Sequence, residues 1–236
     1  MCTASWLIHG DGFELFFNRD ESVRRGPAEA PRRARWGGVE VLAPRDSDAG
    51  GTWIGANAHG LVLGLLNGRE FGPAAGAPRS RGLLVQELLD AAEPAEVWER
   101  LTRSSLAPYR AFSLLVLAPS CGPRVAVWDG TRLGANDPVL PLCSSSLDGG
   151  RAQLECAAVF GRSVTARRPT REELVRFHAS HEPTRGPWSP CMHRAEARTV
   201  SATEVRVGSE RVSMRYAPGA PCETPYGPWI ELERVP

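Results

Sequence analysis

The sequence predicts an antiparallel α+β protein, and three observations support this fold class. Strand-like segments occur in runs, with pairs of helices between the runs. Most consecutive strand-like segments are joined by short turns, which favours hairpins over the long crossover connections of a parallel sheet. The chain contains no internal repeat, so we expect its 236 residues (1–236) to form a single domain.

The first predicted hairpin begins one residue after the initiator methionine. Residues Cys2 to His9 are rich in strand formers, and so are residues Phe13 to Asn18, while Gly10-Asp11-Gly12 between them predicts the turn. The polar run Asn18-Arg19-Asp20-Glu21 then ends the second strand. A strand that starts this close to the end of the chain suggests that the terminus itself has a function.

The length of the turn decides which residue faces Cys2 across this hairpin. A three-residue loop pairs Cys2 with Asp20 and leaves Asn18 diagonal to Cys2, and this is the register we expect. A two-residue loop shifts the pairing by one and places Arg19 or Glu21 opposite Cys2 instead. Opposed side chains lie about 5 Å apart, so each register brings charged groups close to the cysteine.

The remaining elements follow from hydrophobic periodicity and turn residues. Helices are expected to begin at the cap Ser80 and at Pro94. Two more helices are expected at residues 151–160 and 171–180, the second behind a capping box that starts at Thr170. The other predicted strands are residues 52–57, 61–67, 112–117, 125–128, 139–143, 199–207, 212–216 and 229–232.

Two polar segments near the N-terminus are predicted to be loops. Residues 22–37 carry five arginines among prolines and glycine, and a solvated loop is a commoner explanation than an anion site. Residues 46–51 form the second loop and lead into the strand predicted at 52–57.

Composition excludes several classes of protein. The 28 basic residues are all arginine, which excludes lysine-based catalysis, and the net charge of +1 gives no reason to expect nucleic acid as a partner. No apolar stretch reaches the roughly 18 residues of a membrane span, and no Gly-rich phosphate-binding motif is present. Because the N-terminus also lacks a secretory signal, we expect a cytoplasmic protein.

The six cysteines are scattered and form no Cys-x-x-Cys pair. In a chain without a secretory signal, we expect free thiols rather than a disulfide framework. Cys191-x-His193 with Cys222 offers three zinc ligands, but the spacing matches no usual pattern and the sequence identifies no fourth ligand. His181 and the other histidines have no mutual spacing that indicates a site. We therefore interpret these residues as ordinary loop residues and expect no metal.

Cys2 is the strongest candidate for a catalytic residue. A small residue at position 2 permits removal of Met1, and the α-amino group of Cys2, with an ordinary pKa of about 7.7–8.0, could then act as general base for its own thiol. Asp20 could orient this amine, and Arg19 could stabilise the thiolate. The amide of Asn67, at a strand end, could donate to an oxyanion. Judged on the hairpin alone, a buried small residue remains the simpler interpretation of Cys2.

Four ordered motifs resemble the NRDE family, the group that includes the transport and Golgi organisation proteins. They are Met1-Cys2, Asn18-Arg19-Asp20-Glu21, the block from Gly50 to Gly55, and Asn67-Gly68-Arg69. Weaker similarity continues at residues 109–112, 145–148 and 198–203, so the resemblance spans nearly the whole chain.

The NRDE family is similar to N-terminal-nucleophile hydrolases near the choloylglycine and penicillin V acylases. The resemblance implies a four-layer αββα sandwich of two antiparallel sheets, with Cys2 as nucleophile, Asp20 near its amine and Asn67 near the oxyanion. Asn18 and Arg19 complete the candidate catalytic set. These acylases place an arginine before the asparagine of the second strand, where this chain has Phe17, and Ser145 or Ser146 stands in place of a later asparagine.

The resemblance implies two functions, which differ in chemistry. The first is an N-terminal-nucleophile amidohydrolase that acts on a small acylated amide and requires no cofactor. The second is a non-catalytic haem or acyl-lipid binding or trafficking protein on the same scaffold, with haem as its ligand and His193 as a residue to test. Both take a small molecule as partner, and both leave the oligomeric state open. A scaffold protein with an incidental Cys2 is the third hypothesis.

Overall fold

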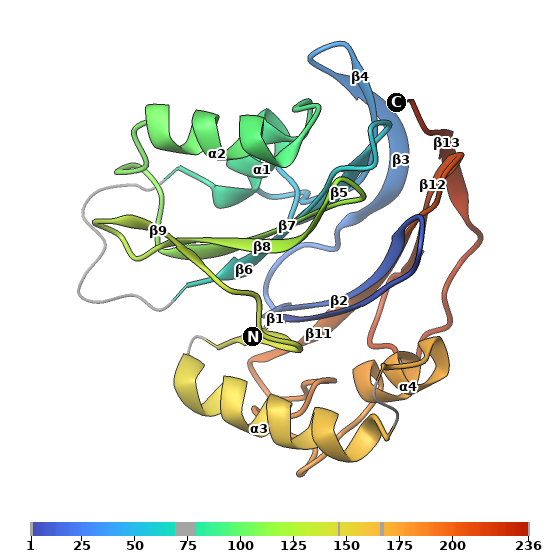
Figure 1. Cartoon of the computed structure of the whole chain (residues 1–236). Coiled ribbons are helices and arrows are strands. Elements are labelled where there is room, and N and C mark those ends of the chain that lie inside the picture. Colours follow the sequence, from blue (N-terminus) through green and yellow to red (C-terminus); the bar gives the residue numbers. More distant parts are fainter. Residues whose placement is uncertain (1, 69–78, 146, 166–167, 236) are drawn as a thin grey trace.

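The chain folds into two antiparallel sheets that pack face to face, with helices on both outer faces (Figure 1). The computed structural model describes residues 2–68, 79–145, 147–165 and 168–235. The predicted Arg69 and Ser146 therefore lie outside the described residues. No helix in the described ranges has both the length and the apolar character needed to cross a membrane.

Among the described residues, six strands form the first sheet and seven form the second. The six-stranded sheet has the order β10-β1-β2-β11-β12-β13 and consists of β1 (Cys2–Ile8), β2 (Phe13–Ser22), β10 (Leu142–Ser144), β11 (Ala197–Val207), β12 (Arg211–Ala217) and β13 (Ile230–Glu233). The seven-stranded sheet runs in chain order and consists of β3 (Glu29–Trp36), β4 (Val39–Arg45), β5 (Ile54–Asn57), β6 (Val62–Asn67), β7 (Phe112–Ala118), β8 (Cys121–Trp128) and β9 (Leu133–Asn136).

Four described helices cover the outer faces of the sheets. Helices α1 (Arg81–Leu88) and α2 (Pro94–Arg103) pack on the seven-stranded sheet, and α3 (Gly149–Ser163) and α4 (Arg171–His178) pack on the six-stranded sheet (Figure 1). The predicted four-layer αββα sandwich is therefore confirmed. The capping box of α4 is also present, because the Glu173 backbone N–H donates to the Thr170 hydroxyl and the Thr170 N–H donates to the Glu173 carboxylate.

Strand β2 shows how the sequence separates the layers. Successive side chains of a strand point to opposite faces of its sheet. Leu15 and Phe17 accordingly lie in the core between the two sheets, whereas Phe16 points to the helix layer, where its ring centroid lies 5.9 Å from that of His178. Both faces of β2 are buried in its first eight residues, so this strand connects the central core to the helical layer.

The register of the first hairpin differs from the one we expected. Cys2 pairs with Arg19 rather than Asp20, as in the two-residue-loop alternative, and the His9 N–H donates to the Gly12 carbonyl at 2.8 Å. Gly12 instead lies at the start of the paired region and packs closely against β11, because a Cβ built on Gly12 would lie 1.9 Å from the Val207 carbonyl oxygen. The turn therefore contains only Gly10 and Asp11, which shifts the whole pairing by one residue.

The predicted loop at residues 22–37 is wrong in its second half. Residues Glu29–Trp36 form β3, which pairs with β4, and neither β4 nor β9 was predicted from the sequence. Strand β3 lies at the edge of its sheet. Edge strands commonly carry charges that prevent pairing with other chains, so the arginines that indicated a loop are typical of this position.

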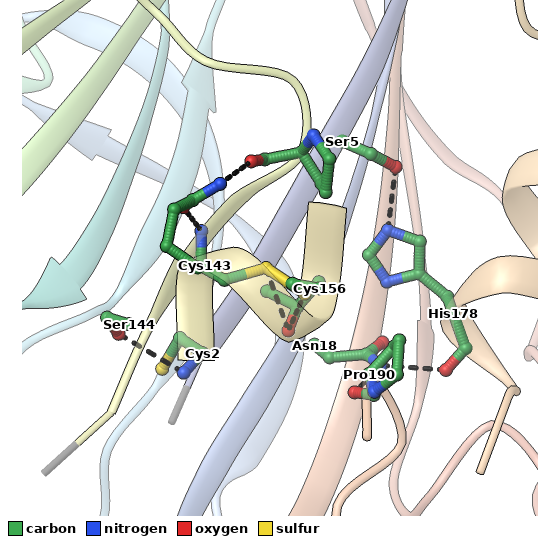
Figure 2. The surroundings of a disulfide bond; sticks show 11 residues. Cys2, Ser5, Asn18, Cys143, Ser144, Cys156, His178 and Pro190 are labelled. Carbon is green, nitrogen blue, oxygen red and sulfur yellow. Dashed lines mark hydrogen bonds between the residues drawn. A yellow bond between two sulfur atoms is a disulfide. The ribbon is translucent and has the colours of Figure 1, made fainter. Parts of the chain in front are cut away.

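The expectation of free thiols is wrong for one pair of cysteines. Cys143 at β10 and Cys156 in α3 form a disulfide, with their Cα atoms 6.6 Å apart (Figure 2). The pair forms because α3 folds back over β10, a tertiary contact that cysteine spacing does not reveal. The other four described cysteines are free thiols.

Candidate active site

Cys2 lies at the start of β1, between the strand that carries Arg19 and the strand that carries Ser144. It is 6% exposed and lines a pocket of about 400 Å³. Arg19, Asp20 and Asn67 line the same pocket, so the structure brings together four of the five predicted site residues. The two sheets supply them jointly, because Asn67 ends β6 of the seven-stranded sheet.

Asn18 is the predicted site residue that does not line this pocket. Its side-chain amide points to the helix layer, where it donates to the His178 carbonyl at 2.8 Å and the Pro190 carbonyl at 2.9 Å (Figure 2). Alternation along β2 explains this placement, because Asn18 and Arg19 must point to opposite faces of the sheet. Asn18 thus fixes the segment that follows α4 against the six-stranded sheet.

The backbone nitrogen of Cys2 donates to the Ser144 hydroxyl at 3.2 Å (Figure 2). This nitrogen is the atom that removal of Met1 would convert into the α-amino group. Burial raises the pKa of the Cys2 thiol, while a hydrogen bond from the Asp20 backbone and the charge of Arg19 act in the opposite direction. The thiol is therefore protonated at neutral pH and needs a base to become a nucleophile.

Asp20 is a buried residue of the pocket lining, and the pKa of its carboxyl group is raised. Burial raises the pKa of its carboxyl group to about 7, although a hydrogen bond from Thr199 favours the ionised form. The Thr199 hydroxyl donates to Asp20 Oδ1 at 2.5 Å and accepts from the Met192 backbone N–H at 2.9 Å. A carboxyl group with a pKa near 7 can exchange protons under physiological conditions.

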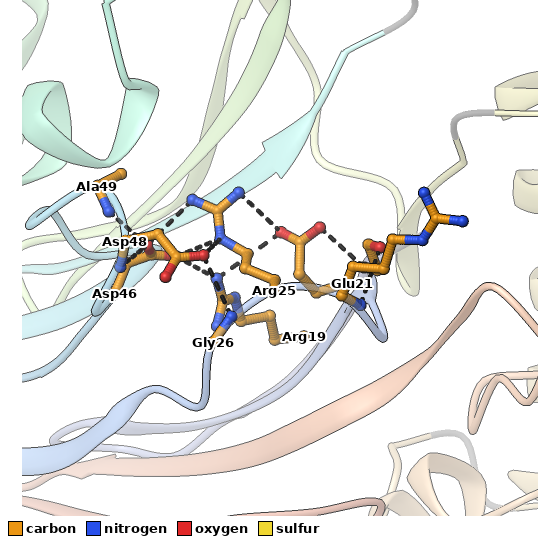
Figure 3. A network of polar contacts seen from close by, with 9 residues as sticks. Arg19, Glu21, Arg25, Gly26, Asp46, Asp48 and Ala49 are labelled. Carbon is orange, nitrogen blue, oxygen red and sulfur yellow. Dashed lines mark hydrogen bonds and ion pairs between the residues drawn. The ribbon is translucent and has the colours of Figure 1, made fainter.

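A polar network holds Arg19 at the side of the pocket (Figure 3). The Arg19 guanidinium lies 4.0 Å from the centre of the Trp53 ring and forms an ion pair with Asp46. Arg25 also binds Asp46, through Nε at 2.8 Å and Nη2 at 3.0 Å. Burial opposes ionisation of Asp46, but the hydrogen bonds from Arg25 and Ala49 and the charge of Arg19 lower its pKa. Asp46 therefore remains a carboxylate that anchors both arginines.

The lining of the pocket carries more positive than negative groups. Five arginines line it against three carboxylates, namely Arg19, Arg25, Arg79, Arg81 and Arg110 against Asp20, Glu21 and Asp46. Arg81 is oriented by α1, of which it is the first residue, and its Nη1 donates to the Ala111 carbonyl at 2.7 Å. The excess of arginines favours a ligand that carries a negative charge.

Sequence reasoning missed three residues that support the site. Ser144, in β10, accepts a hydrogen bond from the Cys2 backbone nitrogen, and Thr199, in β11, donates one to the Asp20 carboxylate. Asp46, which follows β4, forms an ion pair with Arg19. Thr199 belongs to the motif at residues 198–203, and Ser144 precedes the serines at 145 and 146, but nothing in the sequence gives either residue a contact. Ser145 itself is buried and accepts from the Leu147 N–H at 3.1 Å.

A second group of reactive side chains lies outside this pocket. The structure brings His181 to Cys191, His193 and Cys222, and so provides the fourth potential metal ligand that the sequence did not identify. The four residues thus lie together in the structure, a grouping that their spacing in the sequence did not indicate.

Solved structures with a similar fold include an acylase, a bile acid hydrolase and an acid amidase. Penicillin V acylase from Agrobacterium tumefaciens is 14% identical, with a TM-score of 0.60 over 98% of this chain and 86% of that chain. A mutant of conjugated bile acid hydrolase from Clostridium perfringens is 12% identical, with a TM-score of 0.56 over 99% and 92%. The Caenorhabditis elegans orthologue of N-acylethanolamine-hydrolysing acid amidase is 11% identical, with a TM-score of 0.55 over 86% and 92%. At these identities, the similarity establishes the fold alone.

The sequence itself matches one protein family. No curated protein matches the chain. Residues 1–146 match the model of the family described as Transport and Golgi organisation 2, and this range contains all four motifs that carried the predicted resemblance. Since the match covers more than half of the 236 residues, the chain belongs to the Transport and Golgi organisation 2 family.

Proposed function

We propose that this protein is an N-terminal-nucleophile amidohydrolase that cleaves a small acylated amide after removal of Met1. The observation that carries the proposal is the placement of Cys2 in a pocket with Asp20 and Asn67. The thiol and the future α-amino nitrogen belong to the same residue, so nucleophile and base are held together without a separate histidine. The hydrolase fold of the neighbouring structures supports the same chemistry.

In the first half of the reaction, the Cys2 thiol transfers its proton to its own α-amino nitrogen while Sγ attacks the carbonyl carbon of the amide. The carbonyl electrons move to oxygen, and the Asn67 amide donates to the resulting oxyanion. Asp20 and Ser144 orient the α-amino group. The C–N bond then breaks, the ammonium returns the proton to the leaving amine, and an acyl thioester remains on Cys2.

In the second half, water attacks the thioester and the free α-amino group accepts a proton from this water. The C–S bond breaks, the carboxylic acid leaves, and the α-ammonium group returns its proton to sulfur, which regenerates the Cys2 thiol and the free amine. Arg19 lies opposite Cys2 and adds positive charge where negative charge develops in both halves.

The charge of the pocket limits the class of substrate. An amide with a carboxylate or another anionic group would balance the excess of arginines in the lining. Arg81 and Arg110 line the pocket and are the arginines proposed to contact this group. The pocket volume of about 400 Å³ suits a small ligand.

The haem-binding alternative has less support. None of the described residues that line the pocket is a histidine, so a haem there would depend on Cys2 as its axial ligand. His193 lies instead with the cysteines of the second group. The amidohydrolase uses the same residues without adding a cofactor, and we therefore prefer it.

A panel of N-acyl amides with neutral or carboxylate-bearing amine halves tests the proposal, with amine release as the readout. We expect hydrolysis by the full-length protein, no activity above background for Cys2→Ala, and a fall in kcat of about 10²- to 10³-fold for Asn67→Ala. The variant Arg110→Ala should raise KM more for carboxylate-bearing substrates than for neutral ones.

The matched control is Cys121→Ala, which removes a free thiol from β8, outside the pocket. It should retain the wild-type rate. Equal rates for Cys2→Ala and the wild-type protein would refute the proposal, and so would an inactive protein whose N-terminal residue is verified to be Cys2.

A further inference from the structure

His181, Cys191, His193 and Cys222 come together from two loops of the six-stranded sheet layer. The first three lie between α4 and β11, and Cys222 lies after β12. Each residue offers one ligand atom, and all four of these atoms lie within 4.8 Å of one another. The cluster is separate from the pocket around Cys2, because none of its four residues lines that pocket.

The distances within the cluster suit a single tetrahedral ion. The two sulfur atoms of Cys191 and Cys222 are 3.4 Å apart, and His193 Nε2 lies 3.5 Å from Cys191 Sγ and 3.3 Å from Cys222 Sγ. With Zn–S bonds of about 2.3 Å and Zn–N bonds of about 2.0–2.1 Å, tetrahedral geometry places ligand atoms about 3.4–3.8 Å apart. The three observed separations lie close to this range.

His181 supplies an independent observation. Its ring packs edge-on against that of His193, with centroids 5.0 Å apart. Its Nε2 atom is shielded from solvent and has no hydrogen-bond partner among the described residues. A buried polar atom without a partner is costly, and a metal ion would satisfy it.

Backbone contacts hold the first loop in place. The Cys191 N–H donates to the Ser180 carbonyl at 3.0 Å, and the Cys191 carbonyl accepts from the Ser189 hydroxyl at 2.8 Å. Next to it, the Pro190 carbonyl accepts from the Asn18 amide at 2.9 Å. Hydrogen bonds within the loop therefore hold both sides of Cys191, and the neighbouring Pro190 is tied to β2, as a ligand of a preformed site requires.

The second loop presents Cys222 from a turn. The N–H groups of Glu223 and Thr224 both donate to the Ala220 carbonyl, at 3.0 Å and 2.8 Å. This turn and the Cys191 segment are far apart in sequence, and the cluster is where they meet. A metal ion would join the two loops in the way a disulfide joins two strands.

We propose that His181, Cys191, His193 and Cys222 bind one structural Zn²⁺ ion. Two thiolates and two imidazoles in tetrahedral arrangement favour zinc over harder or square-planar metal ions. Four protein ligands leave no open position for substrate, so the role is structural. A two-iron cluster with the same ligands would place the cysteines and histidines on different irons, whereas His193 Nε2 contacts both sulfurs here.

Zinc binding would change the contact between His193 and Arg185 next to the cluster. Coordination through His193 Nε2 puts the ring proton on Nδ1, which lies 3.3 Å from the Arg185 guanidinium. Both groups are then donors, so Arg185 turns away. This movement is easy because the Arg185 side chain is 55% exposed and already pairs with Glu223 at 2.6 Å.

The ion would also support the pocket around Cys2. Met192 lies between two of the ligands, and its N–H donates to Thr199, which in turn donates to Asp20. The Thr199 N–H donates back to the Met192 carbonyl at 2.9 Å. Zinc would thus hold the segment that positions the Asp20 carboxylate, but its binding does not depend on the proposed hydrolase activity.

Metal analysis of the full-length protein tests the inference directly. Protein purified without chelators and with exclusion of air should contain one zinc per chain, and chelator-treated protein should take up one equivalent of added Zn²⁺. Co²⁺ in place of zinc should give thiolate-to-metal charge-transfer absorption with the visible bands of a tetrahedral site. The variants Cys222→Ser and His181→Gln should each lose stoichiometric zinc, while the controls Cys121→Ser and His9→Gln should keep it.

Three results would overturn the inference. One is a wild-type protein that takes up no Zn²⁺ or Co²⁺ and in which Cys191 and Cys222 are both alkylated. Another is a Cys191–Cys222 disulfide in the peptide map of the air-free preparation. The third is zinc that persists at full stoichiometry in both ligand variants, which would place it elsewhere. The circular dichroism spectrum of each variant checks that a loss of zinc does not simply reflect unfolding, and the Co²⁺ spectrum needs no variant at all.

Discussion

At the scale of single residues, Asp20 couples the proposed chemistry to pH. Its carboxyl group has a pKa of about 7 because it is buried, and the ionised form is the stronger hydrogen-bond acceptor and the only form that stabilises a positively charged α-amino group of Cys2 by charge. The value of kcat/KM should therefore rise as pH rises through this region. The α-amino group of Cys2 has an ordinary pKa in the same region, so the rising limb of the pH profile of kcat/KM reports the titration of both groups together rather than of Asp20 alone.

The variant Thr199→Val tests the role of Asp20 in this pH dependence, because the direction of its effect can be predicted. The Thr199 hydroxyl donates to Asp20 and favours its ionised form, so its removal raises the pKa of Asp20 further. We expect the rising limb of the pH profile of kcat/KM to move to higher pH. Thr203→Val is the matched control on the same strand, and it should leave the limb in place. A limb that does not move in Thr199→Val would contradict the assigned role of Asp20.

The burial of His178 predicts that the stability of the folded protein decreases at low pH. Burial lowers the pKa of this histidine to about 3, and its Nε2 atom is hydrogen-bonded to the Ser5 hydroxyl at 2.8 Å. Below pH 6.5 the unfolded chain takes up a proton that the folded chain excludes, so stability is lost as pH falls from about 6.5 toward 3. At pH 5 this loss is about 2 kcal/mol relative to neutral pH.

Urea unfolding of the wild-type protein and of His178→Gln between pH 7.5 and pH 5 measures this loss. Glutamine can keep a hydrogen bond to Ser5 but does not titrate. We expect the stability of the wild type to fall relative to the variant as the pH is lowered. A constant difference between the two proteins would show that His178 does not contribute to the pH dependence.

At the scale of elements, the disulfide fastens α3 to the edge of the six-stranded sheet. Cys143 and Cys156 are 13 residues apart, and closing a loop of this size in the unfolded chain is worth about 3 kcal/mol. The double variant Cys143→Ala/Cys156→Ala should lose about this free energy of unfolding, measured by urea titration. Cys121→Ala should change it little. An unchanged midpoint in the double variant, or six alkylatable thiols in the denatured wild type, would contradict the pairing.

Sequence patterns predicted an element correctly where the contacts that define it lie within the element itself. The capping box at Thr170 and Glu173 is satisfied within the helix itself, so it was visible in the sequence. The hairpin register was not, because Gly12 serves close packing against Val207 rather than the turn, and that contact comes from a strand almost 200 residues away. Strand β3 was missed for a related reason, since its arginines suit an edge strand as well as a loop.

At the scale of the whole molecule, the two sheets assemble the candidate site. The sequence indicated Cys2, Asp20 and Asn67 through motifs, and the sandwich places all three around one pocket. Ser144, Thr199 and His181 could not be predicted as partners, because each meets its contact only when distant strands or loops are packed together. The NRDE motifs therefore identified the fold and five candidate residues, four of which line the pocket, while the supporting contacts depend on tertiary structure.

The central claim is that Cys2 becomes the N-terminal residue and attacks an acyl carbon. Peptide mapping by mass spectrometry after incubation with a cysteine-directed acylating reagent tests it in one measurement. We expect an N-terminal peptide that begins at Cys2 and carries the acyl group on sulfur, with Cys121, Cys191 and Cys222 modified more slowly. An N-terminal peptide that retains Met1 with an unmodified Cys2 would contradict the claim.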